Sequence, residues 1–70
     1  MELTNMYRNI VVKHKGSTQI FNDTMEVSMH LDECEIQVSE CNYILIMVDS
    51  EHKHITSSMF NKILLSEIKS

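Results

Sequence analysis

The stretch MEVSMHLDECEIQVS, residues 25–39, decides the fold that the sequence predicts. Apolar residues occupy every second position on either side of the pair Asp32-Glu33. Strict alternation with a period of two is typical of a half-buried β-strand. We therefore predict a hairpin with its turn at Asp32-Glu33, in which His30 faces Glu35. Its buried face would carry Met25, Val27, Met29, Leu31, Cys34, Ile36 and Val38.

The flanking segments predict the rest of a sheet and one helix. Residues 6–13 contain a β-branched run, and residues 18–21 return from a turn at Gly16. Residues 42–49 form a strand that is apolar on both faces, and Thr56 is a good N-cap for an amphipathic helix over residues 57–69. The predicted fold class is α+β: an antiparallel β-meander of four to five strands with one C-terminal helix packed on one face. Residues 1–70 are expected to form a single domain.

Composition narrows the class of protein further. The sequence shows no apolar run long enough to span a membrane and no basic-then-apolar leader pattern, so we expect neither a membrane span nor a secretory signal. On an extended chain Cys34 and Cys41 would lie about 20 Å apart, too far for a disulfide. We therefore expect reduced thiols and a cytoplasmic location. The chain has no Pro or Trp and a single Gly, a skew that AT-rich coding produces and that small proteins of bacterial viruses or of AT-rich bacteria often show.

The charge pattern is the main indication of function. No Lys or Arg occurs from Ser17 to His52. This stretch carries eight carboxylates: Asp23, Glu26, Asp32, Glu33, Glu35, Glu40, Asp49 and Glu51. On neighbouring strands they would form one negative surface, at spacings close to the roughly 7 Å between phosphates of a nucleic-acid strand. A surface that serves only solubility is the alternative, but such surfaces usually mix both signs of charge.

These eight carboxylates predict the partner-binding face of a non-enzymatic module that blocks a basic, nucleic-acid-binding protein. The charge distribution, and nothing else in the chain, resembles that of small acidic inhibitors that mimic DNA. The alternative is a structural or assembly subunit, because Ile44, Ile46 and Val48 form a second apolar strand face that a homodimer would bury. Direct binding to nucleic acid is not expected, since the six Lys and Arg residues lie towards the two ends of the chain.

Neither a catalytic site nor a metal site is predicted. A 70-residue chain with one Gly offers little concavity in which a nucleophile and its base could meet. His52 and His54 would point the same way in an extended segment, but Cys34 and Cys41 lack the short spacing of zinc ligands. We interpret the two histidines as exposed residues of the loop before the helix, and we expect no cofactor.

Overall fold

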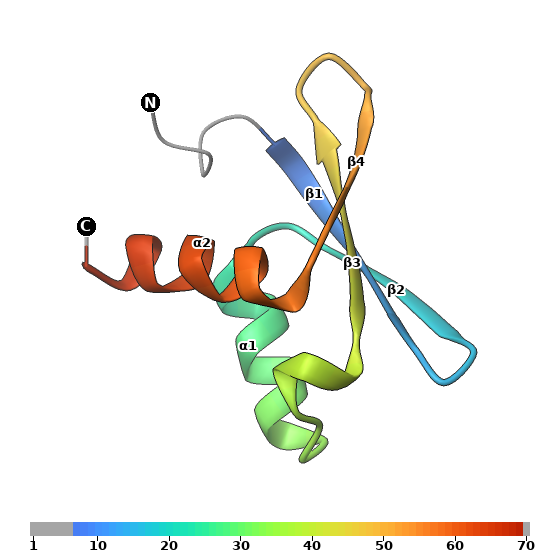
Figure 1. Ribbon diagram of the computed structural model, residues 1–70, viewed down its shortest axis with the longest axis vertical. Helices are drawn as coiled ribbons and strands as arrows, with labels where there is room; N and C mark the ends of the chain where they lie inside the picture. Colours follow the sequence, from blue (N-terminus) through green and yellow to red (C-terminus); the bar gives the residue numbers. More distant parts are fainter. Residues whose placement is uncertain (1–6, 70) are drawn as a thin grey trace.

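The computed structural model describes residues 7–69, which form a four-stranded antiparallel sheet with two α-helices and a short 3-10 helix (Figure 1). In chain order the elements are β1 (Tyr7–His14), β2 (Ser17–Phe21), α1 (Thr24–Glu33), η2 (Val38–Glu40), β3 (Asn42–Met47), β4 (His52–Ile55) and α2 (Ser57–Lys69). The predicted α+β class, the antiparallel sheet and the C-terminal helix are confirmed. Met6, the first residue of the first predicted strand, lies outside the described residues.

The strands lie in the order β2-β1-β3-β4, and every neighbouring pair is antiparallel. β1 and β2 form a hairpin whose turn contains Gly16 at φ 85°, a backbone conformation that glycine adopts without steric cost. α1 then carries the chain from β2, at one edge of the sheet, to β3 on the other side of β1. The predicted meander is therefore wrong in its connectivity, because β2 and β3 follow each other in sequence but are not neighbours.

The largest correction concerns residues 25–39, where the predicted hairpin is wrong and the chain forms α1 and η2. Asp23 is the N-cap of α1, and its Oδ1 accepts the backbone N–H of Glu26 at 2.9 Å. Thr24, Val27 and Leu31 are buried along one side of this helix, three and four residues apart. That spacing matches the helical period of 3.6 residues, and the sheet is consequently covered by two helices instead of one.

The remaining apolar positions of the predicted hairpin show why its pattern was misleading. Met25 and Met29 lie on the outer side of α1 and are 45% and 61% exposed. They alternate with buried residues in sequence, but they are not part of the core. Val27 and Leu31, four residues apart, satisfy the strand period and the helix period equally well.

β4 is a second correction, because the sequence predicts that His52 and His54 lie in a loop before the helix. They pair in antiparallel register with β3, so that His54 lies opposite Ile44 and His52 lies opposite Ile46. The strand predicted over residues 42–49 ends at Met47, and Ser50 makes the turn with φ 73°. β4 is thus an edge strand that leads directly into α2.

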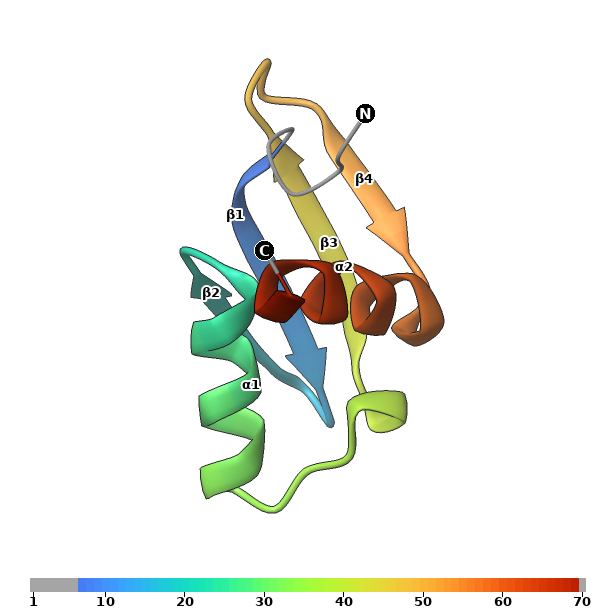
Figure 2. The same ribbon diagram turned by 90° about the vertical axis from the view of Figure 1, so that its left-hand side faces the viewer.

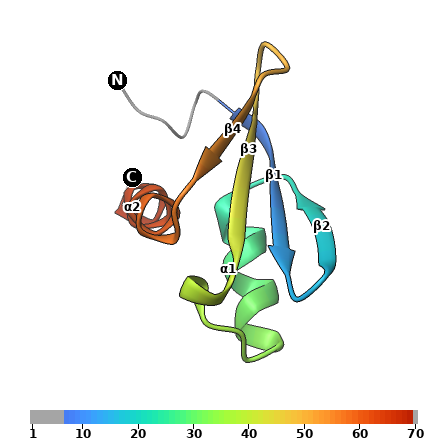
Figure 3. The same cartoon turned by 45° about the vertical axis from the view of Figure 1, so that its right-hand side comes forward.

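Both helices pack against the same face of the sheet (Figure 2, Figure 3). At the centre of this core the ring of Tyr43 stacks on the ring of Phe60, with centroids 4.2 Å apart and an interplanar angle of 6°. The Tyr43 hydroxyl donates a hydrogen bond of 2.8 Å to the carbonyl of Val38, which ties η2 to the sheet. α2 begins as predicted, since Thr56 Oγ1 accepts the N–H of Met59 at 3.1 Å.

Candidate functional site

The eight carboxylates singled out from the sequence do not lie on strands. The start of α1 carries Asp23 and Glu26, and its end carries Asp32, Glu33 and Glu35. The short helix η2 contains Glu40, and the connection between β3 and β4 contains Asp49 and Glu51. The predicted placement on a sheet surface is therefore wrong. The end of α1 and the β3–β4 connection lie at opposite ends of the molecule (Figure 1). A role of these residues in partner binding stays a prediction.

Four of the carboxylates have local roles in the backbone. Asp23 Oδ1 accepts the Glu26 N–H, and Glu26 Oε1 accepts the N–H of Asn22 at 3.2 Å. Asp49 Oδ1 accepts the N–H of Glu51 at 3.2 Å in the turn before β4. Hydrogen bonds of this kind satisfy backbone donors at helix starts and turns. These carboxylates therefore stabilise local structure, whatever the protein binds.

Glu40 is the fourth carboxylate of this group. Its Oε2 accepts the N–H of Gln37 at 2.8 Å, and its Oε1 lies 3.6 Å from Nε2 of His14. The hydrogen bond from Gln37, with a smaller contribution from His14, holds the pKa of Glu40 below its ordinary value. Glu40 thereby links η2 to the end of β1, on the same side of the molecule as the end of α1.

Asp32, Glu33 and Glu35 are different, because all three are exposed and none of their carboxylates makes a hydrogen bond or ion pair in the described part of the chain. They lie at the C-terminal end of α1, which is the negative end of the helix dipole. Carboxylates are stabilising at the other end of a helix and unfavourable at this one. Three like charges, unopposed by a Lys or Arg in the surrounding sequence, therefore lie at an electrostatically unfavourable place.

A groove beside these carboxylates combines acidic and apolar side chains. It runs between the second half of α1 and the segment that leads into η2, and its volume is about 570 Å³. Asp32 and Glu35 contribute the charges, and Met29, Ile36 and Val38 contribute apolar surface. Met29 is 61% exposed, which is high for a large apolar side chain. Such a groove fits a side chain with an aliphatic stem and a cationic head, that is, a lysine or an arginine.

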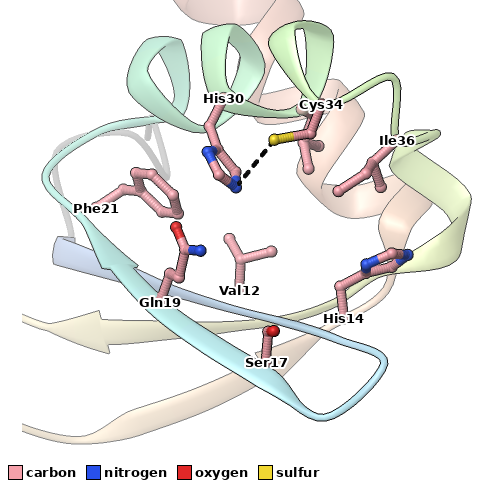
Figure 4. Close-up of a pocket in the computed structure, with 9 residues that line it drawn as sticks. Val12, His14, Ser17, Gln19, Phe21, His30, Cys34 and Ile36 are labelled. Atoms are coloured by element: carbon pink, nitrogen blue, oxygen red, sulfur yellow. Dashed lines mark hydrogen bonds between the residues drawn. The ribbon is translucent and has the colours of Figure 1, made fainter.

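A second concavity lies between α1 and the β1–β2 hairpin (Figure 4). This cleft has a volume of about 200 Å³, and Val12 and Phe21 contribute apolar surface to it. His30 and Cys34 line it from α1, with Nε2 of His30 4.0 Å from Sγ of Cys34. Gln19 faces them from β2 (Figure 4). The sequence did not predict this cleft, because it placed His30 on a strand opposite Glu35.

The pairing of a thiol with an imidazole raises the question of nucleophilic catalysis. A reactive thiolate is normally stabilised by positive surroundings such as a helix N-terminus or a neighbouring cation. Cys34 is instead the C-cap of α1, next to Asp32, Glu33 and Glu35. These surroundings are negative, and the geometry gives a thiolate nucleophile no support.

The other predicted site residues are placed as follows. Ile44 and Ile46 lie on the sheet face that turns away from the helices; Ile44 is 8% exposed and Ile46 is partly buried. Val48 is 64% exposed and lies beyond the end of β3. The three residues therefore do not form one continuous exposed face. Both cysteines are free, and burial raises the pKa of the Cys41 thiol.

Comparisons of the chain with protein families, with curated protein sequences and with solved structures found no match. Within residues 7–69, neither helix is long and apolar enough to cross a bilayer.

Proposed function

We propose that this protein is a non-enzymatic binding module that docks the C-terminal end of α1 and its groove onto a basic surface of another protein. The observation that carries the proposal is the set of three carboxylates without partners, Asp32, Glu33 and Glu35. They oppose both one another and the helix dipole, and a cationic partner would relieve that repulsion. The exposed Met29 beside them supplies adaptable apolar contact area, as methionine does at many binding surfaces.

The partner class follows from the charge. Surfaces rich in Lys and Arg are the common property of proteins that bind nucleic acid, because they must neutralise phosphates. A module with a concentrated negative end can occupy such a surface and block it. The proposed binding surface is one end of the molecule, and its carboxylates lack the regular phosphate-like spacing that neighbouring strands would give. Attraction between opposite charges would make association fast and sensitive to salt.

Two matched double variants test this proposal. Asp32→Asn/Glu35→Gln removes two charges at the groove, and Asp49→Asn/Glu51→Gln removes two charges at the opposite end of the molecule. We expect wild type and the second variant to capture the same basic protein from a cell lysate, and the first variant to lose it. Added double-stranded DNA should release the captured protein. Equal capture by both variants, or a captured protein that DNA does not displace, would refute the proposal.

Self-association remains a second candidate, because within residues 7–69 neither helix packs on the second face of the sheet (Figure 3). Ile20 on β2 is 64% exposed on this face, and Val11 and Ile44 lie beside it on β1 and β3. A homodimer would bury Ile20 and Ile46 together. Sedimentation of wild type and Ile20→Ser distinguishes the two candidates: a concentration-dependent dimer that the substitution abolishes supports self-association.

A further inference from the structure

The cleft between α1 and the β1–β2 hairpin brings together two side chains whose chemistry suits a metal ion. His30 and Cys34 are four residues apart, which places them on one side of the helix. The two side chains face each other across 4.0 Å at the cleft (Figure 4). The ring of Phe21 packs against the imidazole, with centroids 5.2 Å apart, and so restricts its orientation.

We infer that His30 and Cys34 bind a divalent transition-metal ion such as Zn²⁺ or Co²⁺ through Nε2 and Sγ. A tetrahedral zinc ion holds its nitrogen ligands at about 2.0–2.1 Å and its sulfur ligands at about 2.3 Å, which places two such ligands roughly 3.5 Å apart. The separation in the structure exceeds this by about half an ångström, a gap that a small side-chain rotation closes. Imidazole and thiolate are ligands that these ions prefer, whereas Mg²⁺ and Ca²⁺ prefer oxygen.

The charges around Cys34 favour a cation at this place. The thiol lies at the negative end of α1, and Asp32, Glu33 and Glu35 add three negative charges nearby. The same field that gives a free thiolate no support therefore attracts a divalent cation. When the metal–sulfur bond forms, the thiol proton leaves to solvent and the charge of the ion compensates the thiolate. The metal site is thus independent of the partner proposed above, although it shares the negative end of α1.

Two protein ligands leave the ion open towards the cleft. Within the described residues no third His, Cys, Asp or Glu completes a metal-binding group with this pair. A tetrahedral ion would keep two positions for water or a small ligand, as catalytic zinc sites keep one position open. The cleft volume of about 200 Å³ accommodates several waters at roughly 30 Å³ each. Ser17 and Gln19 on the opposite wall offer a hydroxyl and an amide to whatever occupies those positions (Figure 4).

Cobalt titration of the reduced full chain tests the inference directly. A thiolate bound to Co²⁺ gives a charge-transfer absorption in the near ultraviolet, which reports a cobalt–sulfur bond and not merely bound metal. We expect this band in wild type, its loss in Cys34→Ser, and weaker binding in His30→Ala. The double variant His52→Ala/His54→Ala is the matched control, because it removes the other exposed histidine pair, on β4, and should keep the band.

Each other outcome would overturn the inference. A band that survives in Cys34→Ser would place the thiolate ligand at Cys41, and a band that His52→Ala/His54→Ala abolishes would place the nitrogen ligands on β4. Absence of the band in wild type would mean that the pair does not bind metal. A measurement that needs no variant uses Zn²⁺ and the ring resonances of the histidines in wild type. The His30 resonances should shift first, and equal shifts of all four histidines would contradict a defined site.

Discussion

Replacing Asp23 by alanine tests why residues 24–33 form a helix and not a strand. The alternation of apolar residues in this segment favours a strand, and a ten-residue helix is too short to be stable in isolation. The helix therefore depends on burial of its inner side and on its first turn. Asp23→Ala removes the side chain that accepts the Glu26 N–H at 2.9 Å and leaves every core contact in place.

The expected effect is a loss of about 1 kcal/mol in the free energy of unfolding, the typical cost of replacing an N-cap aspartate by alanine. A domain of this size has a total stability of roughly 3–5 kcal/mol, so the loss is a substantial fraction of it. For a domain of this length it lowers Tm by about 4–8 °C. Circular dichroism during thermal and urea unfolding measures the change. Amide exchange should also quicken at Glu26, whose N–H loses its acceptor.

The conservative variant Asp23→Asn is the control, since asparagine caps helices about as well as aspartate. It should retain nearly all of the stability. If Asp23→Ala unfolds at the same temperature as wild type, the cap does not stabilise α1. If Asp23→Asn loses as much as Asp23→Ala, the negative charge and not the hydrogen bond is what matters. Either result would refute the reasoning.

Three further predictions follow from the packing and from the pKa shifts. Tyr43→Phe should cost about 1 kcal/mol in urea unfolding, because it removes the hydroxyl that donates to the carbonyl of Val38. The pKa of Glu40 is lowered in the folded state, so its contribution to stability is present above the unfolded pKa and is lost as the pH falls through the folded pKa. In Glu40→Gln the free energy of unfolding should therefore fall less steeply as the pH is lowered. Urea unfolding at a series of pH values measures this dependence. An alkylating reagent should modify the exposed Cys34 before the buried Cys41, whose thiol has a raised pKa. Mass spectrometry should find one label on the native chain and two labels in urea. Equal labelling rates at the two thiols would contradict the burial of Cys41.

The sequence predicts those elements in which one period dominates. The β-branched run of β1 and the apolar strand β3 suit only a strand, and the cap at Thr56 with an apolar stripe suits only a helix. Residues 25–31 fit both periods, because Val27 and Leu31 are separated by four positions. The deciding signal was local: an aspartate followed three residues later by a glutamate, Asp23 and Glu26, is typical of a helix start. β4 could not be found from its own four residues, which carry no alternation of apolar and polar side chains.

The sequence could predict which acidic residues form the candidate site, but not how they are arranged in space. Counting charges correctly identified a segment without Lys or Arg, but it could not distinguish carboxylates that accept backbone N–H groups from those that do not. That distinction depends on where helices and turns begin. The sequence analysis placed these starts wrongly, because it predicted a strand where α1 forms. The His30–Cys34 pair was missed for the same reason, since a spacing of four residues brings side chains together only on a helix.

The distribution of carboxylates along α1 bears on whether its negative end serves solubility alone. At the start of the helix, Asp23 and Glu26 accept hydrogen bonds and agree with the helix dipole, so they stabilise the fold. At its end, Asp32 and Glu33 oppose the dipole and, with Glu35, repel one another. Solubility requires net charge but no particular position, and the same charges would cost less on another exposed surface. Because this arrangement costs folding energy while exposing Met29 and a groove, it supports the proposal that a cationic protein partner docks at this end of the molecule.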